Sequence, residues 1–300
     1  MAPVATLAVA VALLLDLAVA EPPERVHPVA WFGRLVGVFD RQFQRPRMVG
    51  LLVATVLPFV AAVAAAFPVW VLLRFDPILG GLAAGLLLFT TVSLRMLVTM
   101  GAEVVAGSEA DLERAREQAL ALVGRDRASL SPAEIRSAAV ESVAENLADG
   151  LLAPLLAFVL GSVVSLPIGV GAAAWVKGVN TLDSMLGYPD KAVGTASARL
   201  DDAVEWLPAR LSALVIALAA RDPRALLRAR QWARDPASPN SGWPMATLAA
   251  AAGVQLRKPG AYTLNPDAPL PTVETASRAI RMVGFAGLLA FALAGVGTWW

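Results

Sequence analysis

The sequence contains no cysteine and only one histidine, His27. Without cysteine the chain can form no disulfide, bind no metal through a thiolate and use no cysteine nucleophile. A single histidine also makes a His-rich zinc or haem site implausible. The formal net charge is only +1, so nothing indicates a nucleic-acid partner. There is likewise no G-x-x-x-x-G-K-[ST], H-E-x-x-H or G-x-S-x-G motif, so the common phosphate-binding and hydrolase sites are absent.

Charge is scarce overall, because 16% of the residues are charged and 57% are hydrophobic, with a mean hydropathy of +0.62. Several apolar runs are long enough to cross the ~30 Å hydrocarbon core of a bilayer. We therefore expect an all-α, polytopic helical membrane protein with about four to six membrane segments. It should form a single integral membrane domain over residues 1–300. The expected segments are 3–20, 49–73, 78–100, 151–176 and 282–300, with 207–220 uncertain.

Two of these segments leave alternatives open. The first ends in Ala18-Val19-Ala20, which resembles a signal-peptide cleavage site. No basic residue precedes it and Asp16 interrupts its apolar core, so an uncleaved membrane segment is favoured. Proline and glycine interrupt 151–176, which is typical of a re-entrant pair of half-helices but also occurs in ordinary membrane helices. We favour the re-entrant form.

The charge is concentrated in four polar stretches, 21–48, 101–150, 177–210 and 221–281. The first carries five arginines and the last nine basic residues, which indicates the cytoplasmic side. The stretch 101–150 follows them if 49–73 and 78–100 form a hairpin. The stretch 177–210 joins them only if 151–176 is re-entrant.

An acidic stripe precedes one apolar segment, in "ESVAENLADGLLAPLL". Ser131 and Glu134 form a capping-box pattern, so we expect one helix over 132–149 that ends at Gly150. Successive acidic residues lie four positions apart and share one helix face; they are Glu141, Glu145 and Asp149. Either this is a solvated acidic face, or cations such as Mg²⁺ or basic side chains compensate it.

A second polar motif is "KGVNTLDSMLGYPDKAVGTASARLDD", residues 177–202. Carboxylates with asparagine are what Mg²⁺ recruits, usually together with phosphate oxygens, and lysine and arginine bind phosphates. The alternative is a polar surface loop. The candidate residues are Lys177, Asn180, Asp183, Lys191, Arg199, Asp201 and Asp202.

Two further stretches supply polar candidates. "SPNSGWPMA", 238–246, carries Asn240, Ser241 and Trp243, although Trp243 suits an interfacial anchor equally well. The stretch before 49–73 carries His27 and Arg34, and a lone histidine more often makes a structural hydrogen bond than a catalytic contact. The residues alone thus indicate a membrane protein with a cytoplasmic site for oxyanions and a divalent cation.

The ordered motifs resemble one family. "HPVAWFGRL", "VGRD", "ESVAENLADG", "NTLDSMLGY", "SARLDD", "WLPAR", "NSGWPMA" and "KPGAY" occur in the order and spacing of the CobD/CbiB family, the adenosylcobinamide-phosphate synthases of cobalamin biosynthesis. The resemblance runs from about Asp16 to Tyr262. One departure is Ala20-Glu21-Pro22, where that family usually has Gly-Asp-Pro. A backbone with φ > 0 at Ala20 is therefore in doubt.

The resemblance implies an ATP-dependent, amide-forming ligase. A propionate of adenosylcobyric acid would be joined to (R)-1-aminopropan-2-ol O-phosphate or a related amino alcohol, with ATP as co-substrate and Mg²⁺ as cofactor. Under this reading Glu141, Glu145 and Asp183 are catalytic candidates. The metal candidates are Glu141, Glu145, Asn146, Asp149, Asp201 and Asp202. The substrate- or phosphate-binding candidates are His27, Arg34, Lys177, Asn180, Arg199, Asn240, Ser241 and Trp243.

Two other functions compete with the enzyme. A non-catalytic, sensor-like relative would not need both acidic groups, and a transporter for a corrinoid or phosphate ester would need ionisable residues within its spans. Only Asp16 and Arg95 clearly lie within expected spans, so the enzyme is favoured. We expect a multi-pass protein of the cell membrane with a cytoplasmic active site. Its expected partners are the lipid bilayer, the two substrates, and a second copy or other corrinoid-pathway enzymes.

Overall fold

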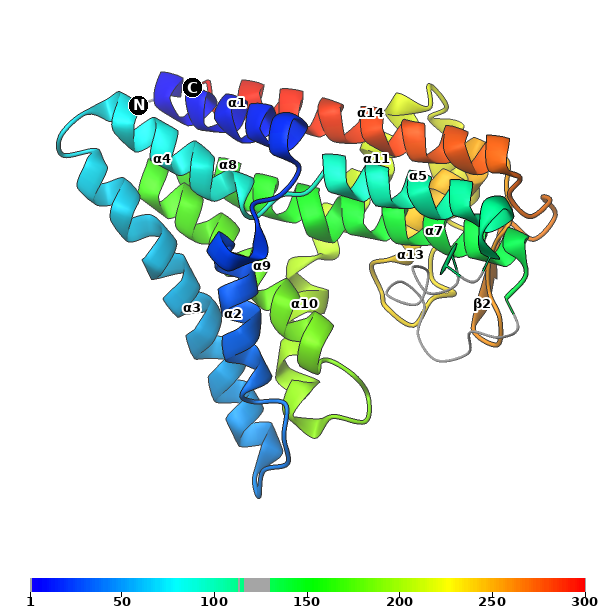
Figure 1. Cartoon of the computed structure of the whole chain (residues 1–300), viewed down its shortest axis with the longest axis horizontal. Helices are drawn as coiled ribbons and strands as arrows, with labels where there is room; N and C mark the ends of the chain where they lie inside the picture. The colour runs from blue at the N-terminus through cyan, green and yellow to red at the C-terminus, as the bar shows by residue number, and fades with distance from the viewer. Residues whose placement is uncertain (1, 113, 116–129, 300) are drawn as a thin grey trace. The chain divides into compact units, whose positions relative to one another are not determined.

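A computed structural model describes residues 2–112, 114–115 and 130–299, and it confirms the all-α membrane class (Figure 1). Three described helices are long and apolar enough to cross a membrane: Pro46–Leu72, Pro132–Ser162 and Val273–Gly297. The chain divides into two compact units. Unit 1 comprises Met1–Ser93, Asp149–Glu205 and Ala290–Trp300, and unit 2 comprises Leu94–Ala148 and Trp206–Leu289. The motif "VGRD", 123–126, lies outside the described residues.

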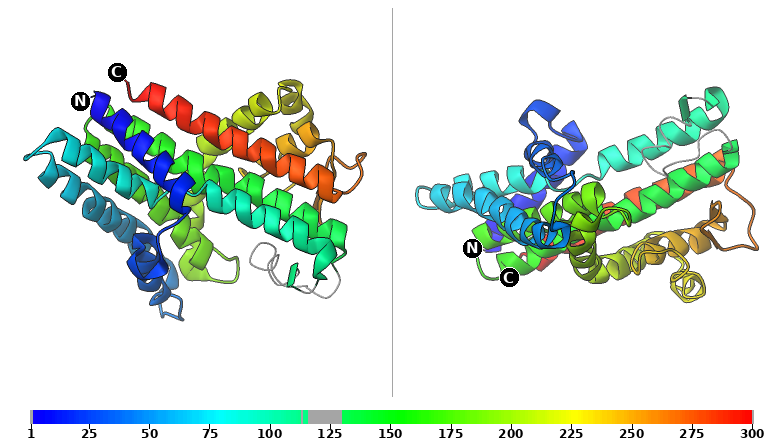
Figure 2. Two further views of the ribbon diagram at one scale, coloured as in Figure 1. Left: turned by 45° about the horizontal axis from the view of Figure 1, so that its top comes forward. Right: turned by 90° about the horizontal axis from the view of Figure 1, so that it is seen from below.

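Unit 1 is a group of packed helices. They are α1 (Ala2–Val19), α2 (Pro28–Gly37), α3 (Pro46–Leu72), α4 (Pro77–Phe89), α8 (Ala153–Ser162), α9 (Leu166–Leu186) and α10 (Thr195–Val204), with the 3₁₀ turns Glu24–Val26 and Ala192–Gly194. Helix α1 packs on α4, and α9 packs on α3, α8 and α10 (Figures 1 and 2). Helix α4 begins where the Asp76 carboxylate accepts hydrogen bonds from two backbone amides of its first turn, which satisfies donors that a helix start leaves unpaired.

The segment expected at 151–176 is two helices, because the chain turns between α8 and α9. Ser165 caps the second helix, and its hydroxyl accepts a hydrogen bond from Ile168 N. The two helices approach closely, since a Cβ added to Gly161 would stand 2.8 Å from the Cα of Gly169. The small residues that made this segment look interrupted therefore form a helical hairpin.

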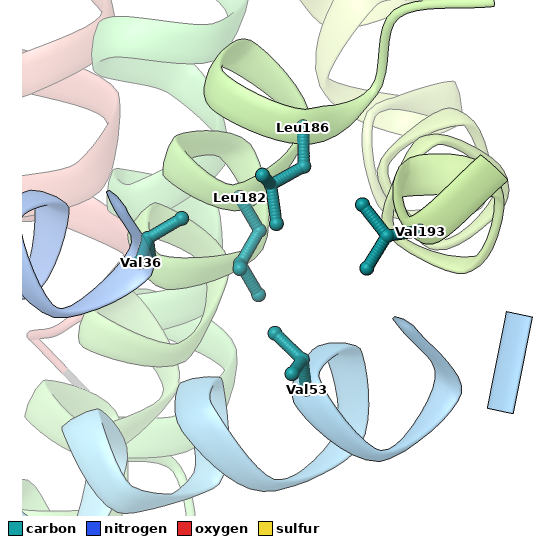
Figure 3. Packing of buried hydrophobic residues seen from close by; sticks show 5 residues of the cluster. All are labelled: Val36, Val53, Leu182, Leu186 and Val193. Carbon is teal, nitrogen blue, oxygen red and sulfur yellow. The ribbon is translucent and has the colours of Figure 1, made fainter. Parts of the chain in front are cut away.

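A compact apolar cluster packs against the C-terminal half of α9 (Figure 3). Val36 of α2, Val53 of α3, Leu182 and Leu186 of α9, and Val193 of the following 3₁₀ turn are each at most 6% exposed. Burying a side chain of this size contributes about 1.5–3 kcal/mol. The cluster thus holds α9, which carries residues 177–186 of the polar motif, against α2 and α3.

Unit 2 contains α5 (Arg95–Ala110), α7 (Pro132–Leu147), α11 (Trp206–Ala219), α12 (Arg224–Ala229) and α13 (Gly242–Ala252), a hairpin of β1 (Leu256–Lys258) and β2 (Tyr262–Leu264), and most of α14 (Val273–Gly297). Helix α7 packs on α5, α13 and β1. The segment expected at 78–100 is also interrupted, because α4 ends at Phe89 and α5 starts at Arg95.

The capping box predicted for α7 is confirmed, since the Ser131 and Glu134 side chains each bond the other's backbone amide. The predicted stop at Gly150 is wrong. The chain continues through a π-helical turn, Ala148–Leu152, into α8. A glycine inside a helix costs about 1 kcal/mol relative to alanine, and burial of the neighbouring leucines outweighs this cost. The Gly150 carbonyl accepts a hydrogen bond from Ser93 N at 3.0 Å, which gives the irregular turn a partner outside its helix.

Candidate functional site

A cluster of charged side chains lies within unit 1 and draws on four separate parts of the chain. They are the linker after α1, the π-helical turn, the polar half of α9, and α10. Seven residues that the sequence predicted belong to it, through the pairwise interactions described below. They are His27, Asp149, Lys177, Asn180, Asp183, Asp201 and Asp202. We call these residues, together with Glu21 and Glu205, the acidic cluster.

The linker after α1 contributes Glu21 and His27. Ala20 ends α1 with φ 69°, and its amide donates to Asp16 O at 2.9 Å. The left-handed conformation that the sequence placed in doubt is therefore present without a glycine. His27 caps α2, where its Nδ1 accepts from Val29 N at 3.2 Å, and its Nε2 lies 3.8 Å from a Glu21 carboxylate oxygen. Burial lowers the pKa of His27, with Glu21 opposing and Lys177 reinforcing that shift.

Lys177, on α9, lies within electrostatic range of three carboxylates, namely Asp149, Glu21 and Glu205. One ammonium therefore faces three acidic groups from three different parts of the chain. Lys177 also lines an apolar groove of about 410 Å³ whose other walls include Phe32, Leu57 and Ala61. The Lys177 side chain thus stands where apolar surface meets the acidic cluster.

The opposite side of the cluster is formed by Asp183 of α9 with Asp201 and Asp202 of α10. Burial, followed by the charges of Asp183, Glu205 and Asp202, raises the pKa of Asp201 to about 8, although a hydrogen bond from Asn180 opposes this. Burial and the charge of Asp202 raise the pKa of Asp183, and burial raises that of Asp202. One oxygen each of Asp183 and Asp201 is buried with no hydrogen-bond partner among the described residues.

Sequence analysis missed Glu205, which directly follows α10 and is only 2% exposed. It lies one helical turn after Asp201, so the two share a face. Burial raises the pKa of Glu205 to about 7, against the opposing effects of Asp149 and Lys177. The four-residue spacing from Asp201 was the available signal, but nothing local distinguishes "DDAVEW" from a solvated helix end.

The acidic cluster supplies oxygen ligands of the kind that Mg²⁺ prefers. Within the described ranges, however, no three His, Asp or Glu side chains are placed to hold a metal ion. Mg²⁺ is usually bound through one or two carboxylates, with waters and substrate phosphates completing its shell. The unpartnered oxygens of Asp183 and Asp201 therefore fit a Mg²⁺ that arrives with a phosphate, but they do not form a complete site.

Three predicted residues of unit 1 lie apart from these contacts. Arg34 and Arg199 are exposed, with no hydrogen bond or ion pair to any residue described. Lys191 is committed to the fold, because its Nζ donates to Asp40 at 2.8 Å and to Met185 O at 3.1 Å. It therefore ties the loop after α9 to the end of α2.

In unit 2, Glu141 is not part of a solvated face, because it is only 4% exposed. Its two oxygens accept hydrogen bonds from Ser137 Oγ at 2.7 Å and from Tyr262 Oη at 2.6 Å. Ser137 also accepts from Arg257 N at 2.7 Å. Burial and the Glu141 carboxylate raise the pKa of Tyr262. Glu141 therefore binds the β-hairpin, including "KPGAY", to α7.

The stripe's other members have different surroundings. Glu145 is half-buried and influences Tyr262 electrostatically. Asn146 is exposed, and its amide donates back to Ser142. Asp149 belongs to unit 1, beside Lys177 and Glu205. The two ends of the stripe thus meet different partners.

"WLPAR" and "NSGWPMA" meet in unit 2 around Arg210, which sequence analysis did not select. Its guanidinium lies 4.7 Å from the ring centroid of Trp206 and 5.4 Å from that of Trp243. It also donates to Asn240 Oδ1 and, at 3.2 Å, to Pro239 O. Asn240 and the neighbouring Ser241 are buried. Asn240 and Trp243 of the predicted group therefore contact one stacked arginine, and Ser241 lies next to them in sequence, its amide donating to Ser238 Oγ.

A family model described as "CobD/Cbib protein" matches residues 9–284. The probable cobalamin biosynthesis protein CobD of Methanothrix thermoacetophila is 38% identical over 298 residues, covering 93% of this chain and 92% of the relative. Cobalamin biosynthesis protein CobD of Klebsiella pneumoniae is 38% identical over 318 residues, with 96% and 95% covered. Cobalamin biosynthesis protein CbiB of Salmonella typhimurium is 36% identical over 315 residues, with the same coverage. No solved structure matches. The chain belongs to the CobD/CbiB family.

Proposed function

We propose that this protein acts in cobalamin biosynthesis as adenosylcobinamide-phosphate synthase. It joins a propionate of adenosylcobyric acid to the amine of (R)-1-aminopropan-2-ol O-phosphate, or a related amino alcohol, and ATP and Mg²⁺ activate the carboxylate. The names of its relatives and the match across residues 9–284 support the pathway. The acidic cluster supports the chemistry.

The observation that carries the proposal is the burial in unit 1 of carboxylate oxygens that have no hydrogen-bond partner among the described residues. Burying an unpaired carboxylate costs several kcal/mol, and unsatisfied oxygens occur on Asp183, Asp201 and Glu205. Such a cluster does not stabilise the fold. Perturbed, partly unsatisfied acids beside a lysine are instead typical of a site that completes its interactions with ligands.

The residues divide the proposed work. A carboxylate is a poor acyl donor, so its oxygen attacks the γ-phosphorus of ATP, with ADP leaving. The amine then attacks the acyl phosphate carbon, with inorganic phosphate leaving and one proton lost from nitrogen. Lys177 supplies positive charge to the carboxylate or phosphate, as do Arg34 and Arg199 from the surface if the substrate reaches them.

For the metal, Asp201 and Asp202 remain our proposed ligands, with Asp183 beside them. Bound Mg²⁺ would neutralise phosphate charge. The roles proposed for Glu145 and Asn146 as ligands, and for Asn240, Ser241 and Trp243 as substrate contacts, rest on the family resemblance. Since both oxygens of Glu141 accept hydrogen bonds from Ser137 and Tyr262, its proposed role is to position the β-hairpin on α7.

We also propose that the protein is a multi-pass component of the cell membrane with its active site in the cytoplasm. The support is the five arginines of 21–48, which favour the cytoplasmic side. Glu21 and His27 of that stretch reach the acidic cluster. The soluble substrates, ATP among them, are available there.

The test is amide formation by the purified protein in detergent, supplied with adenosylcobyric acid, aminopropanol phosphate, ATP and Mg²⁺. Mass spectrometry detects the amide. We expect product from the wild type and full activity from the exposed control Asp267→Asn. Asp201→Asn should form at least ~100-fold less product, because removal of a group that binds or polarises the reactants commonly lowers the rate by that much.

Two results would change the proposal. Equal activity of Asp201→Asn and wild type would return the acidic cluster to a structural role. A folded, corrinoid-binding wild type that forms no amide would refute the synthase and favour a sensor or transporter. Replacing the amino alcohol by its homologues in the same assay identifies the amine that is used.

A further inference from the structure

Glu205 is the most unusual member of the acidic cluster. It is 2% exposed, and neither of its carboxylate oxygens has a hydrogen-bond partner in the described part of the chain. Nearly all buried side-chain polar atoms in folded proteins have a partner. Glu205 is therefore a buried hydrogen-bond acceptor whose two oxygens a ligand with N–H or O–H groups would satisfy.

The neighbours of Glu205 do not supply that donor. The Asp149 carboxyl lies close enough to form a hydrogen bond with Glu205 while one of the two holds a proton, but once both are ionised each carboxylate only accepts hydrogen bonds. Lys177 is within electrostatic range, yet no ion pair within 4.0 Å joins the Lys177 ammonium to Glu205 among the described residues. Lys177 is moreover shared with Asp149 and Glu21. When all three carboxylates are ionised, their negative charge exceeds the single positive charge of Lys177, so a second cation is attracted to the cluster.

The geometry favours an ammonium over a metal ion. Mg²⁺ requires ligands at about 2.0–2.1 Å in near-octahedral arrangement and loses its waters reluctantly. No three acidic or histidine side chains in the described ranges are so placed. A primary ammonium instead offers three N–H donors, which reach acceptors at about 2.7–2.9 Å. Two neighbouring carboxylates satisfy it without converging on one point.

We propose that Glu205 and Asp149 bind the primary ammonium group of the amine co-substrate. This inference rests on the proposed function and identifies which group of the amine this site recognises. Lys177 then lies beside the bound ammonium and next to the carboxylate or acyl phosphate. The ammonium becomes the attacking amine when it gives one proton to Glu205 or Asp149, and a second proton leaves the nitrogen as the amide forms. The two reactants would meet between Glu205 and Lys177, so the same cluster gives each one a partner of opposite charge.

The test compares two probes by isothermal calorimetry on the full-length protein in detergent. One is 1-aminopropan-2-ol O-phosphate, and the other is propan-2-yl phosphate, which has the same phosphate ester without the amine. We expect the wild type to bind the amine at least ~10-fold more tightly. Glu205→Gln should reduce that preference to within ~3-fold while its affinity for propan-2-yl phosphate stays unchanged.

Asp149→Asn is the second variant, and it should also lower the preference for the amine. Glu205→Asp keeps the charge on a shorter side chain and should retain part of the preference, which makes it the conservative rescue if Glu205→Gln fails to fold. Asp267→Asn, at an exposed site in unit 2, is the matched control and should behave as the wild type.

Three results overturn the inference. They are a wild type that binds the two probes equally, an unchanged preference in Glu205→Gln, or an equal loss of affinity for both probes in that variant. The amide assay separates this from the proposed function. Amine preference without any amide product would refute the synthase alone. Amide formation with the same KM for the amine in wild type and Glu205→Gln would refute the ammonium site alone.

Discussion

The backbone conformation of Ala20 allows the effect of Ala20→Gly on stability to be predicted in sign and magnitude. Ala20 has φ 69° and closes α1, its amide bonded to Asp16 O. The CobD/CbiB pattern places glycine there, and glycine reaches this conformation without steric cost. Restoring glycine should therefore stabilise the protein.

The magnitude follows from two opposing effects. An L-residue in the left-handed region costs roughly 1–2 kcal/mol, because its Cβ approaches the following carbonyl oxygen. Glycine forfeits about 0.4–1 kcal/mol of that gain, because its unfolded chain has more conformations to lose. Ala20→Gly should thus raise the free energy of unfolding by about 0.5–1 kcal/mol. For a chain of this size that is a rise in Tm of about 1–3 °C.

The assay is thermal unfolding in one detergent at one protein concentration. Ala10→Gly is the matched control, since Ala10 is exposed within α1. There the same substitution should lower stability by about 0.5–1 kcal/mol. Opposite signs for the two variants would support the strained turn. A loss of stability in both would refute it and show that Ala20 gains more from its packing than it loses in backbone strain.

Three further predictions concern both units. Tyr262→Phe removes a hydrogen bond to the buried Glu141, so it should destabilise the protein by about 1–3 kcal/mol; an unchanged Tm would show that the hairpin is held by other contacts. The raised pKa values of Asp201 (about 8) and Glu205 (about 7) mean that the folded state holds protons which the unfolded state has released, so stability should fall as pH rises from about 4 to about 8. Asp201→Asn should flatten that Tm–pH profile, and an identical profile would contradict the raised pKa. Gly194→Ala should lower Tm by several degrees, because a Cβ there collides with backbone atoms of α9; a neutral result would mean that the loop after α9 yields easily.

Much of the fold was predictable because its signals are local. The start of α7 follows from Ser131, Pro132 and Glu134, which act within one turn. The long apolar helices follow from composition and length alone. The continuation through Gly150 was not predictable in this way. A glycine after a helix usually stops it, and only the Ser93 amide and the buried leucines beyond it reverse that preference.

The candidate site divides along the same line. Asp183, Asp201 and Asp202 belong to a motif dense in oxygen ligands, so they could be predicted as site residues from residue type alone. Glu205 follows Asp201 by one helical turn, but its environment is set by Asp149 and Lys177, which lie 56 and 28 positions earlier in the chain. Glu141 shows the converse, since its place in an acidic stripe predicted a ligand, whereas its hydrogen bonds indicate a support.

The departure from the family pattern at Ala20-Glu21 gains a physical meaning from these contacts. The turn keeps the left-handed backbone that a glycine would adopt freely, so the chain leaves α1 in the direction that the pattern implies. Glu21 then carries one methylene more than aspartate, and its carboxylate reaches both His27 and the range of Lys177. Because Glu21 acts on Lys177 through its charge and not through a fixed ligand distance, either aspartate or glutamate can supply that charge at position 21. The same tolerance is expected of an electrostatic site that binds an ammonium ion, and it is not expected of a closed metal site, where a displacement of one methylene alters the coordination.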